Sequence, residues 1–568
     1  MLTRPKVILV SIDSRFIHTN IALRYMKEYT KDLKYDCRIM EYTIQSPLMD
    51  MLDDILDEEP QMVGFSTYIW NVDEVGRLSR LLRIARPDIR LLFGGPEVSW
   101  NAEESLLSLS GDYIITGEGE ETYRELMEKC IMNMEATGFF SLEDNDEIRG
   151  LAAMRNGIPV RFPARNKMDL SRLVFPYSFD EDLKDRIACI EASRGCPYSC
   201  SYCLSSAEKD LRFRSADDVM ADVEKLLGLG ARLVKFMDRT FNAHPDAAEI
   251  FRRIIALETN AVFHFEMSPS MVDASQMEIL KDSPPGRMQF ETGVQSTDER
   301  VLRMIRRFSS GSMEGLRKIL SLGNIHHHLD LIAGLPMDDM ESFNRSFNEI
   351  YSLGPDVLQL GFLKIIKGTP MEKETKRWDI VYSPFPPYQV ISTGTMARTD
   401  MERLKSTEKA LDKYHNTGKF ANSLKYAIGF HENPLLFFEG LGKALDNEGY
   451  RVRSPASDDY YRIFLKYSVR ELERKDGFEA GLMRDLVKYD FLLWNRRQGI
   501  PDFLERINKD TNDIRRRLKR EGGVEGHVEW FENDIVSHLS KNERNQGPVA
   551  ILFEKGRTYG KIITLLQQ

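Results

Sequence analysis

The sequence predicts an α/β protein in three parts: a doubly wound parallel sheet, a (β/α)6-type partial barrel and a mostly helical C-terminal domain. Residues 1–137 alternate short apolar strands with amphipathic helices, a pattern that favours a parallel sheet covered on both faces. Six further strand–helix units occupy residues 186–400, which indicates a barrel, complete or open. From residue 401 to 568 the apolar spacing is mainly helical.

Length and composition limit the class of protein. A chain of 568 residues is longer than one hydrophobic core normally supports, so two to four domains are expected. The net charge of -10 disfavours electrostatic binding to the nucleic-acid backbone, so nucleic acid is not expected as a partner. The N-terminal residues do not resemble a signal peptide, and no run of ~18 apolar residues occurs. We therefore expect a cytoplasmic protein without membrane contact.

In the first part, the strands are expected at 7–11, 36–42, 62–66, 90–93 and 113–116, with helices at 20–29, 49–58, 72–85 and 120–132. In such sheets a ligand lies at the carboxyl ends of the strands. Small or hydroxyl-bearing residues follow three of these strands: Ser66, Thr67, Gly94, Gly95 and Gly117. Residues 138–185 have weak periodicity and many turn signals, which predicts a linker with room for a hairpin.

The barrel strands are expected at 188–192, 233–237, 261–267, 287–292, 325–333 and 357–364. Barrel enzymes carry their sites at the carboxyl ends of the strands. Four polar residues stand at such ends and are candidates for binding a ligand: Asp238, Glu266, Glu291 and Gln295.

Three of the six cysteines, Cys196, Cys200 and Cys203, stand within eight residues on the loop after the first barrel strand. Three thiolates at C-x3-C-x2-C spacing can bind three irons of a [4Fe–4S] cluster and leave the fourth iron open to a ligand. A structural zinc site would need a fourth ligand nearby, and a ferredoxin loop would need C-x2-C-x2-C spacing. Neither is present. Cys37, Cys130 and Cys189 stand singly and are expected to be buried apolar residues.

The segment Cys196–Cys203, with the aromatic Tyr202 just before its last cysteine, resembles the signature of the radical S-adenosylmethionine (SAM) superfamily. The resemblance implies that the cluster binds SAM at its open iron and cleaves it to a 5′-deoxyadenosyl radical. It places Tyr202 near the adenine, Gly334 in the segment beside it, and Arg306 at the SAM carboxylate. It also implies an electron donor such as flavodoxin or ferredoxin.

A doubly wound domain ahead of such a barrel resembles the cobalamin-binding class of radical SAM enzymes. The resemblance implies a corrin over the strand ends, with Gly94 and Gly95 permitting close approach of the nucleotide tail. It implies hydrogen bonds to that tail from Ser66 and Thr67, and closure of the next loop at Gly117. The D-x-H-x-x-G motif is missing, because His18 does not follow Asp13 at that spacing. We therefore expect no histidine ligand to cobalt.

Residues 401–568 resemble a domain of unknown function that follows the barrel in part of this class. The basic run 515–520 is expected to coat a solvated helix face. His326, His327 and His328 stand on a predicted strand, so at most two of them face the barrel interior. A structural role is favoured for these histidines.

The resemblance implies a methyltransferase that acts on an unactivated carbon or a similar centre of a small-molecule or peptide substrate through the deoxyadenosyl radical. The catalytic residues of the protein itself cannot be assigned from the sequence. Two alternatives stay open: a cobalamin-dependent cyclase or oxidative rearrangement enzyme without methyl transfer, and a non-catalytic sensor of redox state or cobalamin. An RNA-modifying, sulfur-inserting enzyme is disfavoured by the cysteine count and the acidic charge.

Overall fold

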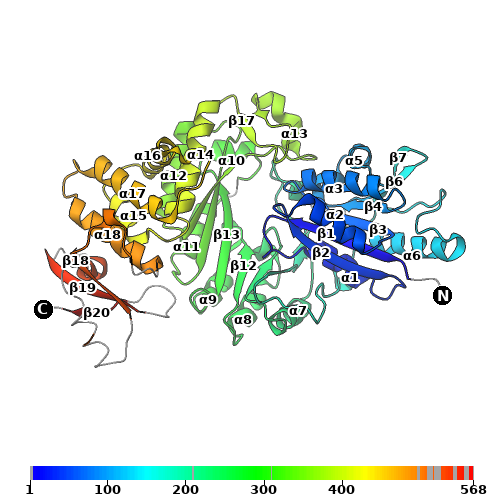
Figure 1. Ribbon diagram of the computed structural model, residues 1–568, viewed down its shortest axis with the longest axis horizontal. Coiled ribbons are helices and arrows are strands. Elements are labelled where there is room, and N and C mark those ends of the chain that lie inside the picture. The colour runs from blue at the N-terminus through cyan, green and yellow to red at the C-terminus, as the bar shows by residue number, and fades with distance from the viewer. Residues whose placement is uncertain are drawn as a thin grey trace.

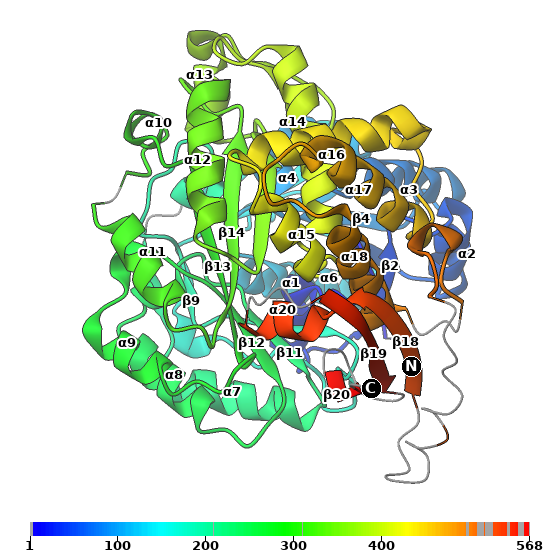
Figure 2. The same cartoon turned by 90° about the vertical axis from the view of Figure 1, so that its left-hand side faces the viewer.

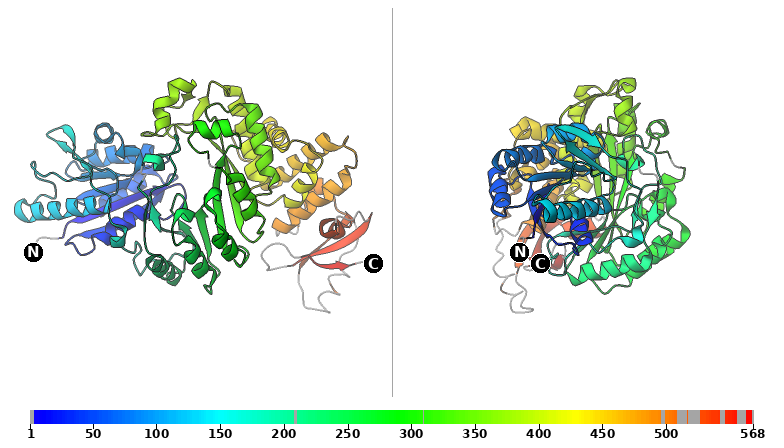
Figure 3. Two further views of the ribbon diagram at one scale, coloured as in Figure 1. Left: turned by 180° about the vertical axis from the view of Figure 1, so that it is seen from behind. Right: turned by 90° about the vertical axis from the view of Figure 1, so that its right-hand side faces the viewer.

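The computed structural model describes residues 4–207, 210–308, 310–495, 499–507, 516, 526–541, 546–554 and 562–566. Its three parts follow one another along the longest axis of the molecule (Figure 1). The barrel lies in the middle, between the N-terminal sheet domain and the C-terminal helices. Seen from behind, the two termini lie at opposite ends (Figure 3). Among the described residues, no helix combines the length and the apolar character needed to cross a membrane.

The first sheet contains seven strands in the order β2-β1-β3-β4-β5-β6-β7. Its strands are β1 (Lys6–Asp13), β2 (Asp36–Thr43), β3 (Met62–Ser66), β4 (Arg90–Gly94), β5 (Tyr113–Ile115), β6 (Leu151–Arg155) and β7 (Ile158–Arg161). The first five are parallel, while β6 and β7 are antiparallel. The hairpin β6–β7 stands within the segment predicted to be a linker, and it extends the sheet at the edge next to β5.

Helices cover both faces of this sheet because successive side chains of each strand point to opposite faces. The helices are α1 (Ile21–Tyr29), α2 (Leu48–Asp57), α3 (Val72–Ala85), α4 (Pro96–Ser99), α5 (Ala102–Ser108) and α6 (Glu120–Thr137). Ile8 and Val10 pack with α2, α3 and α5 in one core, whereas Val7 and Leu9 pack with α1 and α6 in another. The predicted doubly wound architecture is confirmed.

The second sheet is an open parallel barrel of six strands in sequence order: β8 (Ile187–Ile190), β11 (Leu233–Phe236), β12 (Val262–Glu266), β13 (Met288–Gln295), β14 (His326–Ala333) and β15 (Val357–Phe362). Helices cover its outer face (Figure 2): α7 (Ala216–Gly228), α8 (Ala247–Ile255), α9 (Ala274–Leu280), α10 (Glu299–Met304), α11 (Ser312–Leu320) and α12 (Met340–Ser352). The predicted partial barrel is confirmed.

Both edges of the barrel sheet are covered by other segments, which protects edge strands from unwanted pairing. At β8, the amide of Ile187 donates to the carbonyl of Ile17 at 2.7 Å, so a loop of the first domain joins the barrel sheet. At β15, the side chain of Asn416 bonds both the amide and the carbonyl of Leu358 at 3.0 Å.

The C-terminal domain is mostly helical, as predicted. After α13 (Pro370–Glu374), β16 (Val381–Tyr382) and β17 (Val390–Ser392), its helices are α14 (Arg398–Tyr414), α15 (Ala421–Ile428), α16 (Pro434–Leu445), α17 (Ser457–Leu472) and α18 (Ala480–Trp494). A small antiparallel sheet of β18 (Gly526–Asn533), β19 (Gln546–Glu554) and β20 (Ile562–Leu566), with α20 (Ile535–Lys541), was not predicted. Of the basic run 515–520, only residue 516 lies within the described residues.

Candidate active site

Three cysteines lie on the loop that leaves the barrel after β8 and the short strand β9 (Ser193–Arg194). Cys200 is buried, Cys196 and Cys203 are half-buried, and none of the three forms a disulfide. Gly195 begins the loop with a φ of +106°, and a Cβ there would lie 2.6 Å from the carbonyl oxygen of Asp210. This turn therefore requires glycine.

The three thiols lie close enough together to influence one another. Burial is the main cause that raises the pKa of Cys196, and the neighbouring Cys203 and Cys200 raise it further. Within the described ranges, no three Cys, His, Asp or Glu side chains are arranged around a single metal ion. A cluster takes one thiolate on each of three irons, so this donor set fits a [4Fe–4S] group.

A polar pocket of about 430 Å³ opens beside this loop, at the carboxyl ends of β11 to β14. It is lined by Tyr198, Arg239, Thr240, Glu266, Met267, Ser268, Glu291, Gly293, Gln295, Arg307 and Asp330. Two contacts join the pocket to the cysteines: Arg307 Nη1 lies 3.4 Å from Cys200 Sγ, and Thr240 Oγ1 lies 3.7 Å from Cys196 Sγ.

The carboxyl groups of this pocket differ in charge. A hydrogen bond with His264, assisted by Lys235, lowers the pKa of Glu291 to about 2. Burial raises the pKa of Glu266 despite the nearby Arg239. Burial and the neighbouring Glu291 and Glu266 raise the pKa of Asp330 to about 8. At neutral pH the pocket thus offers both an ionised acceptor and a protonated carboxyl donor.

Two buried oxygens in this pocket have no hydrogen-bond partner in the described structure, Oε1 of Gln295 and Oδ1 of Asp330. Buried polar atoms are seldom left unpaired, because each one costs free energy. A ligand with hydroxyl and amino groups, such as SAM, matches these free acceptors and the nearby charges.

The residues predicted to bind SAM divide into two groups. Glu266, Glu291 and Gln295 line the pocket. The others, Tyr202, Asp238, Arg306 and Gly334, do not.

Three of those four are held by the protein around them. Asp238 is buried and accepts hydrogen bonds from Ala192 N and Ser193 Oγ, so it holds the start of the cysteine loop. Tyr202 is half-buried and packs against the core that continues into the C-terminal domain. Gly334 has a φ of +83° and faces Met401, where a Cβ would lie 3.0 Å from the methyl carbon.

Arg306, predicted at the SAM carboxylate, does not line the polar pocket, whereas its neighbour Arg307 does. Arg306 has a φ of 57° just after α10, and its half-exposed side chain pairs with Glu374 at 2.9 Å. The left-handed turn at Arg306 directs the next residue, Arg307, into the pocket. The guanidinium of Arg307 donates from both Nε and Nη2 to the carbonyl of Gly293 and from Nη1 to Cys200 Sγ.

Asp330 and Tyr198 also line the pocket but were not predicted. The signal for Asp330 was the two-residue alternation of β14, which places Asp330 on the same face as His326 and His328.

We expect the free energy of unfolding to depend on the proton of Asp330. The carboxyl has a pKa of 3.8 in an unfolded chain and about 8 in the pocket. Between these values the unfolded chain has lost the proton while the folded protein keeps it, so stability falls as pH rises from about 4 to about 8. The variant Asp330→Asn has no carboxyl to titrate, so it should not lose this stability. The difference between the thermal midpoint of the variant and that of the parent should therefore increase as pH rises from about 4 to about 8. A difference in thermal midpoint that stays constant at all pH values would contradict the raised pKa of Asp330.

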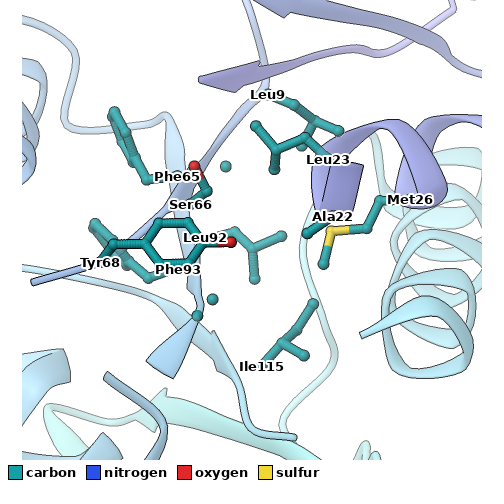
Figure 4. A pocket seen from close by; sticks show the side chains of 13 residues that line it. Leu9, Ala22, Leu23, Met26, Phe65, Ser66, Tyr68, Leu92, Phe93 and Ile115 are labelled. Carbon is teal, nitrogen blue, oxygen red and sulfur yellow. The ribbon is translucent and has the colours of Figure 1, made fainter. Parts of the chain in front are cut away.

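The first domain contains a separate apolar pocket of about 370 Å³ between its sheet and α1 (Figure 4). It is lined by Leu9, Ala22, Leu23, Met26, Gly64, Phe65, Ser66, Tyr68, Leu92, Phe93, Gly94, Gly95 and Ile115. Ser66 Oγ accepts a hydrogen bond from Asn20 Nδ2 at 2.8 Å, so its own proton can go to a ligand. The pocket suits an apolar ring with one polar contact, as in the nucleotide tail of cobalamin.

The other residues predicted around that tail do not line the pocket. Thr67 is buried, and its Oγ1 has no partner in the described residues. Gly117 has a φ of +79° and open space where a Cβ would stand. His18 does not line this pocket: it pairs with Ile187 at the edge of the barrel, near enough to Asp13 at the end of β1 to offset in part the rise that burial causes in the pKa of that carboxyl.

Gly95 is expected to be essential to the apolar pocket. Its φ of +115° disfavours other residues, and an added Cβ would lie 2.4 Å from the carbonyl oxygen of Thr67. We expect Gly95→Ala to lower the free energy of unfolding by about 1–3 kcal/mol and to reduce the cobalamin that copurifies, measured by corrin absorbance. Gly138→Ala is the control, because Gly138 has a φ of +83° but no atom within 4 Å of the added Cβ. Equal loss of cobalamin in both variants would contradict this role.

Ion pairs join the loops beside the two pockets. Arg194, next to the cysteine loop, bonds Glu120 Oε1 at 2.5 Å at the start of α6. Arg212 pairs with Glu118 in the loop before that helix. The ring of Tyr68 lines the apolar pocket, while Arg239, which lines the polar pocket, is near enough to influence its pKa. Residues that line the two pockets therefore lie near one another where the two domains meet.

Comparisons with known proteins agree with this arrangement. Residues 7–127 match the B12 binding domain, residues 190–350 match the radical SAM superfamily, and residues 376–553 match a "Protein of unknown function (DUF4080)". The cobalamin-dependent radical SAM methyltransferase TokK of Streptomyces tokunonensis is 25% identical over 358 residues, which cover 58% of this chain and 50% of TokK. The chain spans about half the length of the curated relatives it matches.

Two solved structures share the fold. The radical SAM methyltransferase TsrM from Kitasatospora setae, with cobalamin and a [4Fe–4S] cluster bound, gives a TM-score of 0.59 at 15% identity and covers 83% of this chain and 100% of that chain. The cobalamin-dependent radical enzyme OxsB gives a TM-score of 0.58 at 15% identity over 86% of this chain and 84% of that chain.

A cysteine loop on an open parallel barrel, preceded by a B12 binding domain, defines a radical SAM protein with a second cofactor domain. The radical SAM domain implies a [4Fe–4S] cluster and SAM, and the first domain implies cobalamin. The chain therefore carries, in this order, a B12 binding domain, a radical SAM domain and a DUF4080 domain, and its relatives include the cobalamin-dependent radical SAM methyltransferase TokK.

Proposed function

We propose that the protein is a methyltransferase that transfers a methyl group to an unactivated carbon of a small molecule. The observation that carries this proposal is the position of the polar pocket. It adjoins Cys200 and Cys196 on one side, and its lining residue Arg239 lies near Tyr68 of the apolar pocket on the other. The methyltransferase names of relatives such as TokK support the same reaction.

Each cofactor has a matching set of residues. Cys196, Cys200 and Cys203 would hold the cluster. Glu266, Glu291, Gln295, Asp330 and Arg307 would hold SAM, with Tyr202, Asp238 and Gly334 as supports around them. Ser66, Gly94 and Gly95 would hold the nucleotide tail of cobalamin, with Thr67 and Gly117 in the adjoining loops outside the pocket. When bound, the cluster and SAM supply a 5′-deoxyadenosyl radical that abstracts hydrogen, and cobalamin supplies the methyl group.

The residues of the chain orient the bound groups and keep charges in place. Arg307 is fixed to the carbonyl of Gly293 through Nε and Nη2, so its Nη1 group stays beside the Cys200 sulfur. Glu291 stays ionised between His264 and Lys235. The protonated carboxyl of Asp330 can donate one hydrogen bond where a second carboxylate would repel Glu291. We propose flavodoxin or ferredoxin as the electron donor.

The test is an anaerobic assay with SAM labelled in its methyl group, a reductant, and a pool of small molecules, with and without cobalamin. The proposal expects a product that carries the labelled methyl group only when cobalamin is present. Deoxyadenosine without label transfer would instead indicate a ring-forming or oxidative reaction. No cleavage of SAM under strong reductant would indicate a sensor.

A further inference from the structure

The interior face of the barrel is the more exposed face of its sheet. Along β14 the burial alternates: His327, Leu329 and Leu331 are buried under the outer helices, whereas His326 and His328 are half-buried on the inner face. The same alternation holds for β11 and β13. Barrel interiors are normally packed with branched apolar side chains. Here, solvent reaches the inner side chains, so the barrel encloses accessible space.

This space lies directly beneath the polar pocket. The strand register places Glu266, Glu291 and His328 at one level, and His264, Gln289 and His326 at the level below. Asp330 and Gln359 stand at the level above. Glu291 lines the polar pocket and also bonds His264 below it, so the two spaces share this residue.

The charged side chains that face this space are already paired with one another. Lys235 Nζ lies 3.4 Å from Glu291 Oε2, which also lies 2.9 Å from His264 Nε2. At the mouth, Arg239 pairs with Glu266 at 3.5 Å. A charged ligand would have to break one of these pairs or remain unpaired, and both outcomes cost free energy in a partly desolvated site.

The groups left over for a ligand are uncharged. His328 forms no hydrogen bond within the described structure and contacts the rings of His264 and His326 edge to face. Burial lowers the pKa of His328 to about 4, so its neutral ring offers one donor and one acceptor. The amide of Gln359, which stands beside Asp330 in the strand register, adds a further uncharged donor and acceptor.

We infer that the barrel interior beneath the polar pocket is the substrate site, and that it takes an uncharged, hydrogen-bonding group of a small molecule, such as an amide, a hydroxyl or a heterocyclic nitrogen. This inference rests on the proposed function, since it places the substrate next to the SAM pocket. It disfavours a purely hydrocarbon substrate, which would leave His328 without a partner.

A matched pair of probes tests the charge preference. Nicotinamide presents an amide and a ring nitrogen, and nicotinate differs from it mainly in its negative charge. Binding of each is measured by equilibrium dialysis to the full chain, reconstituted with the cluster and cobalamin and saturated with SAM, without reductant. Saturation with SAM keeps the probes out of the polar pocket. Because no turnover is needed, the outcome does not depend on whether methyl transfer occurs.

Neighbouring histidines provide the matched variants. His327 and His328 both have a pKa of about 4 because of burial, but they point to opposite faces of β14. We expect His328→Leu to weaken nicotinamide binding about tenfold, the effect of one lost hydrogen bond, and His327→Leu to leave it unchanged. His328→Gln keeps an uncharged donor and acceptor and should retain most of the binding. Thermal midpoints check that each variant folds.

The parent should bind nicotinamide several-fold more tightly than nicotinate. Equal or tighter binding of nicotinate would overturn the uncharged substrate class. No specific binding of nicotinamide, or equal binding by the parent and His328→Leu, would overturn the site. A failure of the proposed function would instead appear as deoxyadenosine formation without transfer of the labelled methyl group. That outcome is independent of how nicotinamide and nicotinate bind.

Discussion

Cys200→Ala is expected to reduce deoxyadenosine formation from SAM to background, a loss of at least about 100-fold. Cys200 is the most buried of the three cysteines, and its thiol accepts from Arg307 at 3.4 Å. Without this thiolate one iron of the cluster has no protein ligand, so both the iron content and the reductive cleavage should fall. The measurement is deoxyadenosine formed under anaerobic conditions, together with iron and sulfide content.

Cys130→Ala is the control for that change. Cys130 is also fully buried, but it lies in the core of the first domain, on α6. We expect its loss to affect stability and to leave the iron content unchanged. If Cys200→Ala kept the cluster and cleaved SAM at the parental rate, the assignment of the cysteine loop would be wrong.

Arg307→Met is expected to slow deoxyadenosine formation about 10- to 100-fold, the effect of removing charge-assisted hydrogen bonds from a buried site. Its guanidinium joins the carbonyl of Gly293 to the Cys200 thiolate. Hydrogen bonds to cluster sulfurs affect the reduction potential, so the loss of this donor should also make the midpoint potential of the cluster more negative. Potentiometry followed by electron paramagnetic resonance measures this shift.

The neighbouring Arg306→Met provides the comparison. Arg306 is half-exposed and pairs with Glu374 away from the pocket. Its replacement should change the deoxyadenosine rate less than about twofold, because exposed ion pairs contribute little. If Arg306→Met slowed deoxyadenosine formation more than Arg307→Met does, Arg306 would be the residue that acts in the pocket.

The arginine pair shows why part of the site escaped prediction. The strand ends could be read from the sequence, because apolar runs and polar residues alternate there, and Glu266, Glu291 and Gln295 do line one pocket. The direction of a side chain after a short helix depends on which residue takes the left-handed turn. Here it is Arg306, with a φ of 57°, and nothing local in the sequence distinguishes it from Arg307.

Long-range pairing explains the remaining differences in the fold. The turn at Asn156-Gly157 was a visible signal for a hairpin, but its place in the first sheet depends on pairing between β5 and β6. The sheet of β18, β19 and β20 likewise forms only by pairing over distance. In contrast, the order of the parallel strands in the first two domains follows from local periodicity, and it was predicted, although the helices α4 and α5 between β4 and β5 were not.

The most direct test of the central claim is the stoichiometry of the products in one anaerobic assay of the full chain with cluster, cobalamin, SAM, reductant and substrate pool. Methyl transfer through a deoxyadenosyl radical consumes two SAM molecules, one for the radical and one for the methyl group. The proposed function therefore predicts equal amounts of 5′-deoxyadenosine and S-adenosylhomocysteine for each labelled product. Deoxyadenosine that accumulates with no S-adenosylhomocysteine, in the presence of bound cobalamin, would contradict it.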